Sequence, residues 1–226
     1  MLTDWKADTY NESEVDDSPA YWAGLGSLYG CPLFKGDSMR THVYIDGFNL
    51  YYGALKDTPY KWLDLQKYFD LLRSSDDIQT IFYFTAEIDG SHRQNQQTYL
   101  SALATLPKVE IVLGNFKFKQ VRCRVKDCDF KGRRFFRTPE EKRTDVNIAV
   151  QMVQDAYERA CEHFVVVSGD SDLVPAIHAV KGVDSTNKVT AYIPATDPKR
   201  GAAVELRSAA DKARILPNIL LRRTQF

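Results

Sequence analysis

The sequence of 226 residues predicts an α/β fold, in which a mainly parallel central sheet is flanked by helices and carries a basic inserted hairpin or loop. Three observations support this prediction. Strand-like and helix-like segments alternate, the inner strand segments are apolar on both faces, and basic residues gather in one stretch between two elements. The length suits one domain with an appendage.

The first half of the domain is expected to contain three strands, at 42–46, 78–85 and 109–113. Helices are expected between them: a short stretch after Asn49, then 62–73 and 91–105. The second of these is amphipathic, because its apolar residues recur at helical spacing: Trp62, Leu65, Phe69 and Leu72.

The second half continues the alternation after the basic stretch. Thr144 is expected to cap a helix that runs to about residue 160 and carries an apolar stripe: Val146, Val150, Val153 and Tyr157. The later elements are a strand at 163–168, a helix at 171–181, a strand at 188–193, a helix at 202–212 and a strand at 213–216. In such sheets ligands bind beyond the C-terminal ends of the strands, so functional residues are expected there.

The charge is zero overall but unevenly distributed. Thirty Lys and Arg balance thirty Asp and Glu, yet residues 1–38 hold seven acids and two bases, and the stretch 117–143 holds eleven bases and four acids. Phenylalanines lie in or beside that basic stretch: Phe116, Phe118, Phe130, Phe135 and Phe136. Cations bind phosphates and aromatic faces stack on unpaired bases, which favours a single-stranded nucleic acid as partner. A solvated hairpin whose phenylalanines face the core is the alternative.

Residues 1–38 are interpreted as an acidic extension, and residues 39–226 as a domain with a basic insert at 115–143. One hypothesis is that the extension masks a basic groove or bridges protomers of a homo-oligomer. A disordered tail, or residues foreign to the protein, is the alternative. Four cysteines, no signal-peptide pattern and no apolar run longer than a strand favour a cytoplasmic protein without a membrane span.

Carboxylates fall where the predicted strands end. Asp46 ends the first strand, Asp170 follows the fourth, Asp172 lies two residues on, and Asp145 opens the helix after the basic stretch. If the first and fourth strands are neighbours, all four face one crevice, and such a cluster is tolerated chiefly when a cation neutralises it. Oxygen ligands favour Mg²⁺ or Mn²⁺, which can activate water against a phosphodiester. Each acid taken alone also fits a helix cap or a turn.

The sequence resembles the NYN-domain proteins, specifically the LabA-like bacterial branch of the PIN-like nuclease superfamily. The resemblance covers about 41–216 and rests on three ordered motifs, YIDGFNLYYG, EKRTDVNIAVQMVQDA and VVVSGDSDLVPAI, with support from HRQNQQTYLSAL and VTAYIP. It implies a PIN-like, Rossmannoid sheet and a divalent-metal-dependent ribonuclease.

The resemblance also implies a set of site residues. The catalytic, metal-binding acids are Asp46, Asp145, Asp170 and Asp172. The residues in the same motifs that are expected to support them or bind substrate are Asn49, Thr144, Asn147, Ser168, Lys142 and Arg143. Apart from the resemblance, Arg93 at the start of the helix after the second strand is expected to bind a phosphate, and a solvent-facing arginine is the alternative.

The cysteines do not favour a zinc site. Cys123 and Cys128 form a C-x4-C pair without a second pair nearby, and Cys161 and His163 follow a later helix. Structural zinc takes four nitrogen or sulfur ligands, so a decayed knuckle or plain thiols are preferred.

The leading hypothesis is an endoribonuclease that hydrolyses single-stranded or structured RNA with Mg²⁺ or Mn²⁺, leaving 5′-phosphate and 3′-hydroxyl ends. A catalytically silent nucleic-acid-binding or assembly module of the same fold is the alternative. A haloacid-dehalogenase-type phosphohydrolase is disfavoured, because Phe48 stands where that chemistry needs a second acid. DNA as the substrate stays open.

Overall fold

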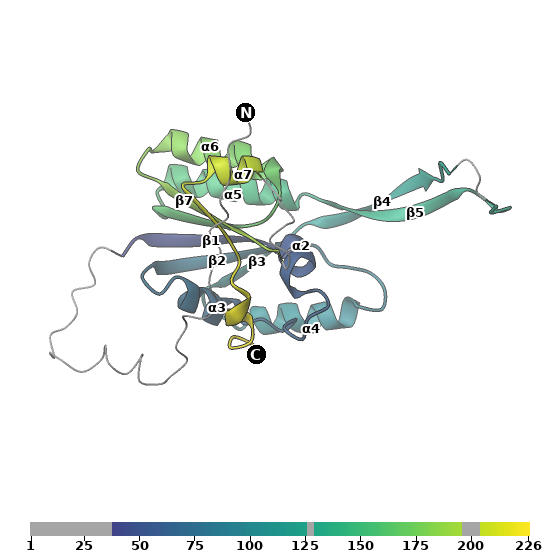
Figure 1. Ribbon diagram of the computed structural model, residues 1–226, viewed down its shortest axis with the longest axis horizontal. Coiled ribbons are helices and arrows are strands. Elements are labelled where there is room, and N and C mark those ends of the chain that lie inside the picture. The colour runs from purple at the N-terminus through teal and green to yellow at the C-terminus, as the bar shows by residue number, and fades with distance from the viewer. Residues whose placement is uncertain (1–37, 126–128, 196–203) are drawn as a thin grey trace, which may run out of the picture. The chain divides into compact units, whose positions relative to one another are not determined.

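The computed structural model describes residues 38–125, 129–195 and 204–226 (Figure 1). In these residues six strands form one sheet in the order β3-β2-β1-β6-β7-β8, and every neighbouring pair is parallel. The strands are β1 Arg40–Asp46, β2 Asp77–Thr85, β3 Val109–Leu113, β6 His163–Val167, β7 Lys188–Ile193 and β8 Lys212–Ile215. The predicted α/β class with a mainly parallel sheet is confirmed.

Helices cover both faces of this sheet (Figure 1). One face carries α2 Gly47–Leu50, the π-helical turn η2 Tyr51–Leu55, α3 Leu65–Leu72, α4 Arg93–Leu103 and α8 Asn218–Leu221. The other face carries α5 Thr144–Glu158, the 3-10 turn η3 Ser171–Leu173, α6 Val174–Val183 and α7 Val204–Ala209. The sequence prediction missed α8, a single turn with too few residues to show a helical period.

The central strand β1 shows why both faces need a cover. Val43 and Ile45 belong to the core on the α3 and α4 side, whereas Tyr44 belongs to the core under α5 and α6, and all three are fully buried. The ring of Tyr44 stacks between Phe82 and Phe164, with centroid separations of 5.6 and 5.9 Å. Each such side chain contributes about 1.5–3 kcal/mol by leaving water, so β1 anchors two cores at once.

Helix α5 turns a different face to the core from its most obvious apolar stripe. It buries Ile148, Met152 and Ala156, while Val150 and Tyr157 of the predicted stripe are exposed. The stripe is therefore wrong as a marker of the core. The buried face also includes Thr144 and Asp155, whose polarity interrupts the apolar pattern that the sequence would otherwise show.

The basic insert is a hairpin. Strands β4 Asn115–Arg122 and β5 Phe135–Lys142 pair antiparallel with each other and with no strand of the parallel sheet in the described residues. The ladder extends away from that sheet beyond the ends of its strands (Figure 1). Most of its side chains are exposed, and its phenylalanines do not enter the core as the alternative interpretation required.

Buried polar networks hold the opposite, N-terminal ends of the strands. The His163 ring contacts Asp76 through Nδ1 and Thr190 through Nε2, both at 2.8 Å, and Arg73 pairs with Asp76. Burial would raise the pKa of Asp76, but its hydrogen bonds with Arg73 and His163 outweigh burial and lower that pKa. None of the helices in the described residues is long and apolar enough to cross a membrane.

Candidate active site

The C-terminal ends of β1 and β6 lie side by side. Ile45 pairs with Val167 in parallel register, so Asp46 and Ser168 follow at the same edge of the sheet. The sequence argument required these two strands to be neighbours, and that condition is met. One hydrogen bond spans the pair directly, because the Ser168 hydroxyl donates to Asp46 Oδ2 at 3.2 Å.

Asp46 is held by donors from the turn that follows it. Asp46 is only 2% exposed. Its carboxylate accepts hydrogen bonds from the Asn49 backbone N–H at 2.9 Å and from Asn49 Nδ2 at 2.5 Å. The turn needs a glycine, because a Cβ on Gly47 would lie 2.8 Å from the Phe84 carbonyl oxygen. Asp46 therefore caps the N-terminus of α2, which is the structural role that the sequence also allowed for it. The same hydrogen bonds hold its carboxylate in place at the site.

The loop after β6 is joined to the same turn. Asn49 Oδ1 accepts from the Gly169 backbone N–H at 3.2 Å, and the Ser168 hydroxyl accepts from the Asp170 N–H at 3.1 Å. Asp170 Oδ1 in turn accepts from the Asp172 N–H at 2.9 Å and caps η3. The hydrogen bonds of Asn49 and Ser168 therefore link the turn that holds Asp46 to the loop that holds Asp170.

Thr144 was expected to cap α5, and that expectation is wrong. Thr144 is the first helical residue, and the residue before it, Arg143, has a left-handed backbone with φ of 82° and no side-chain cap. The buried Thr144 hydroxyl donates to Glu141 Oε1 instead. The chain leaves β5 through a tight turn, which directs this hydroxyl toward the acid rather than toward the helix N–H groups.

Glu141 is a fifth acid that the sequence interpretation did not include. Burial, followed by the charges of Asp46 and Asp145, raises its pKa to about 7, although its hydrogen bond with Thr144 lowers that pKa. Glu141 ends no strand of the parallel sheet, so the strand-end rule could not find it. Its place within the EKRTDVN motif was the available signal.

The four predicted acids act on one another electrostatically. Burial, followed by the charges of Asp46, Asp170 and Asp172, raises the pKa of Asp145 to about 6. Burial also raises the pKa of Asp46, against its hydrogen bonds from Asn49 and Ser168, with a smaller contribution from Asp170. The fold has therefore gathered the predicted carboxylates into one uncompensated negative site.

The donor chemistry of this site fits a hard divalent cation. In the described residues, no group of three or more His, Cys, Asp or Glu side chains is arranged to hold a metal ion directly. Mg²⁺, however, usually keeps several waters and takes only one or two carboxylates from the protein. An all-oxygen set of acids, in which the pKa values of Asp46 and Asp145 are raised, fits that mode and does not fit zinc.

Three of the residues predicted to support the site or bind substrate have no described side-chain bond to its acids. Arg93 begins α4 and faces Glu87 at 4.0 Å, and exposed Lys142 pairs with Glu140 at 2.8 Å. Asn147 lies in the first turn of α5, where its backbone N–H donates to the Arg143 carbonyl. Their roles stay predictions.

The described cysteines are free thiols with different surroundings. Cys123 is half-buried at the outer end of β4, and its C-x4-C partner Cys128 lies outside the described residues. Cys161 is buried with its sulfur 3.7 Å from the Tyr44 hydroxyl, whereas the ring of His163 contacts Asp76. Cys161 and His163 therefore have separate polar partners.

A parallel sheet covered on both faces, with acids gathered at the C-terminal ends of its strands, defines an α/β protein of the PIN-like class. Residues 40–217 match the family described as the NYN domain, which is a member of the PIN-like nuclease superfamily. The chain belongs to the NYN domain family.

One similar protein is 6-hydroxy-3-succinoylpyridine 3-monooxygenase HspA from Pseudomonas putida, which is 30% identical over 75% of this chain. The match covers 64% of that relative, so the chain spans less than two thirds of its length. Among solved structures, a protein of unknown function from Vibrio parahaemolyticus matches with a TM-score of 0.54. That match is 17% identical and covers 81% of this chain and 96% of the other, so it shows the shared fold.

Proposed function

We propose that the protein is a divalent-metal-dependent endoribonuclease. The observation that supports the proposal is the convergence of Asp46, Asp145, Asp170 and Asp172, from β1, α5 and the loop after β6, on one site. Asp46 and Asp170 each cap a helical turn, but capping does not require four carboxylates to lie close enough to repel one another, so the cluster points to a function that uses negative charge. Membership in the NYN family supports a nuclease-type activity.

The four aspartates would hold Mg²⁺ or Mn²⁺, directly or through water. When bound, such an ion activates water and stabilises the charge that develops on a phosphodiester during in-line attack. The chain's own contribution is positioning, because Asn49 and Ser168 fix the Asp46 carboxylate before any ligand arrives. Glu141, with a pKa of about 7, is suited to accept or return a proton at its second oxygen near neutral pH.

RNA is the proposed substrate because a basic, aromatic hairpin adjoins the acids. β5 ends at Lys142, and α5 with Asp145 begins two residues later, so the hairpin and the site share one short turn. Cations bind phosphates and exposed aromatic rings stack on unpaired bases, and the hairpin has both kinds of side chain. A silent binding module would not need the acid cluster, which favours turnover.

The name of the similar protein HspA describes a monooxygenase, and that activity is said of that protein. For this chain, membership in the NYN family favours hydrolysis by a nuclease-type site over hydroxylation. Incubating the protein with 6-hydroxy-3-succinoylpyridine, O₂ and a reduced nicotinamide tests the relative's reaction separately.

The decisive assay follows cleavage of end-labelled RNA and single-stranded DNA of the same sequence in Mg²⁺, Mn²⁺ or EDTA. We expect metal-dependent RNA cleavage, and a loss of at least about 100-fold in the Asp46→Asn and Asp170→Asn variants. The control is Asp57→Asn, an exposed acid with a positive φ of 64° that asparagine also adopts. Undiminished cleavage by both site variants would overturn the assignment, and RNA binding without cleavage in any metal would support the silent module.

A further inference from the structure

We infer that one face of the β4–β5 hairpin binds the unpaired bases of a single strand and directs that strand to the carboxylates. The other face of the hairpin does not bind bases. The inference rests on the proposed function, because it names the form of RNA that the site would receive. It follows from the strand register, which the sequence alone does not give.

The register divides the hairpin into two chemically different faces. Residues directly opposite each other in an antiparallel ladder share a face, and successive residues alternate between faces. The first face, here called the stacking face, carries four pairs: Phe116 with Glu141, Phe118 with Pro139, Gln120 with Arg137, and Arg122 with Phe135. The second, the lysine face, carries Asn115 with Lys142, Lys117 with Glu140, Lys119 with Thr138, and Val121 with Phe136.

The inner end of the stacking face is part of the active site. Glu141 receives the Thr144 hydrogen bond and feels the charges of Asp46 and Asp145. Its pair partner Phe116 packs edge-to-face on Phe48 of α2, with ring centroids 5.6 Å apart. This face is therefore continuous with the acids, whereas Lys142 on the other face pairs with Glu140.

The point where the hairpin leaves the domain is sterically tight. A Cβ on Gly114, directly before β4, would lie 2.8 Å from the Lys142 carbonyl oxygen and 2.8 Å from the Thr144 hydroxyl. The backbones of both hairpin strands thus approach each other and the start of α5 closely. This contact ties the register of the ladder to the position of Thr144, and hence to Glu141.

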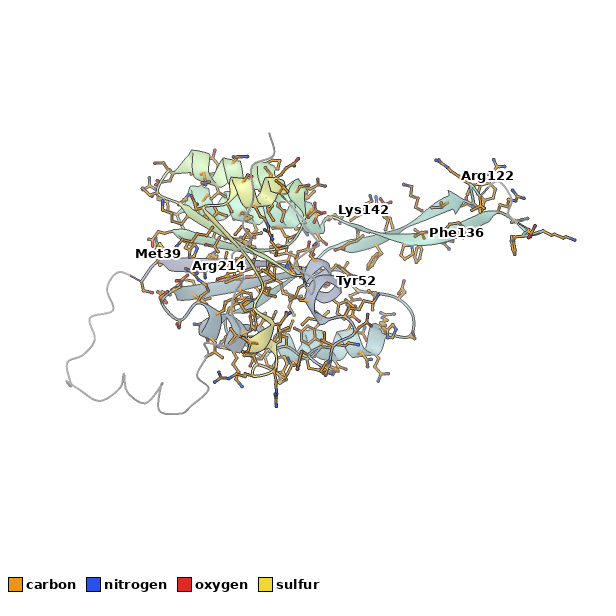
Figure 2. All side chains as sticks on the ribbon, in the orientation of Figure 1. Met39, Tyr52, Arg122, Phe136, Lys142 and Arg214 are labelled. Carbon is orange, nitrogen blue, oxygen red and sulfur yellow. The ribbon has the colours of Figure 1, made fainter. Side chains whose placement is uncertain are left out.

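Farther out, the stacking face presents exposed rings that are each accompanied by an arginine. Phe118 is 50% exposed and lies under the guanidinium of Arg137 at 4.6 Å from the ring centroid. Phe135 is 53% exposed, with Arg122 at 5.9 Å, near the outer end of the hairpin where Figure 2 labels Arg122. Cation–π contact holds each ring with a positive charge beside it, which suits a base and its phosphate together.

The spacing of these groups fits an extended strand. Same-face neighbours along a β-strand are about 6.7 Å apart, so the rings and guanidinium groups recur at regular steps from the outer end to Glu141. The ladder twists, so the stacking face winds around the hairpin as it approaches the domain (Figure 1). A flexible single strand follows such a path, and a duplex, whose base faces are covered by their neighbours, does not.

Adjacent residues provide a matched control. Phe135 and Phe136 are both 53% exposed and both belong to β5, but Phe136 lies on the lysine face, opposite Val121. The two alanine variants remove the same side chain from neighbouring positions on opposite faces. Neither ring belongs to the buried cores of the domain, so its loss leaves the parallel sheet intact.

The test measures the affinity of the full chain for a labelled single-stranded RNA, its DNA equivalent and an RNA duplex, in EDTA. We expect Phe135→Ala and Phe118→Ala to weaken single-strand binding by about 5- to 100-fold each, the loss of one base stack. Phe136→Ala should change it less than about 2-fold, and no variant should alter the weaker duplex binding. Equal losses in Phe135→Ala and Phe136→Ala, or equal losses on duplex, would overturn the inference.

A second measurement separates this inference from the proposed function. Hydrolysis of the small ester bis(4-nitrophenyl) phosphate with Mn²⁺ needs the acids but not the hairpin, so it should be unchanged in the control variant Phe136→Ala and lost in Asp46→Asn. If no ester or RNA is hydrolysed while the two faces still differ in binding, the proposed function fails and the stacking face stands. If hydrolysis proceeds while the two faces behave alike in binding, the proposed function stands and the inference about the stacking face fails.

Discussion

Glu141 is held in the site by one hydrogen bond and opposed there by two charges. The Thr144 hydroxyl donates to it, while partial burial and the nearby Asp46 and Asp145 disfavour its ionised form. Its pKa of about 7 lies well above the ordinary value for a glutamate. In the folded protein Glu141 therefore binds a proton more readily than in the unfolded chain, and its ionisation at higher pH costs stability.

This cost predicts that Glu141→Gln stabilises the metal-free protein at alkaline pH. Glutamine keeps the oxygen that accepts from Thr144 and removes the charge, so at pH 8 we expect a gain of about 1 kcal/mol after allowance for partial exposure. The gain should shrink as the pH falls through 7 and vanish below 4.5, where the wild-type carboxyl is protonated in both the folded and the unfolded states. Urea unfolding in EDTA at pH 8 and pH 5 measures the difference, and destabilisation at both pH values would contradict the charge argument.

At the scale of single elements, α5 carries two apolar faces. The inner face packs Ile148, Met152 and Ala156 against the sheet. The outer residues Val150 and Val153 instead line an open groove of about 500 Å³ against α6, which Pro175 and Ala179 complete. Helical spacing alone predicts a helix but does not say which of two apolar faces enters the core.

Because one apolar face of α5 is buried and the other is exposed, truncating a side chain should lower the free energy of unfolding more on the inner face than on the outer face. Ile148→Ala removes a fully buried side chain and should lower the free energy of unfolding by about 2–4 kcal/mol. Val150→Ala, at a residue 57% exposed, should change it by less than about 0.5 kcal/mol. Chemical denaturation of both variants checks this, and a large loss in Val150→Ala would mean that the groove is covered in solution.

The sequence predicts the elements that obey a simple period and the acids that end a strand. Asp46 and Asp170 could be found because parallel strands end at one edge, and because the apolar runs in β1 and β6 mark both as strands. Glu141 and the true role of Thr144 could not, because both depend on how β5 returns to the domain. That return is set by a left-handed Arg143 and a crowded Gly114, which are tertiary features with no periodic signature.

At the scale of the whole molecule, charge is segregated along the chain. Residues 1–38 hold seven acids and two bases, opposite in sign to the basic hairpin. All but one of these residues lie outside the described structure. The prediction that they mask the basic surface therefore rests on their charge and on the length of the segment. A segment of 37 residues is long enough to reach any part of a domain of this size.

Masking predicts that deletion of 1–38 tightens RNA binding. We expect a several-fold gain in affinity at 50 mM salt and a smaller gain at 300 mM, because salt screens the competing segment. The matched control keeps the length but replaces the seven acids by their amides, and should behave like the deletion. Identical affinities and salt slopes for the deletion and the full chain would exclude masking.

The position of β1 at the centre of the sheet also governs when the site can exist. Asp46 and the hydroxyl of Ser168 that binds it are 122 residues apart in the chain. During synthesis Asp46 leaves the ribosome long before β6, and a sheet built from such distant pairings forms late and slowly. A chain that stops before β6 lacks Ser168, Asp170 and Asp172 together. Under the proposed function, a copy that stops before β6 would therefore not cleave the message that encodes it.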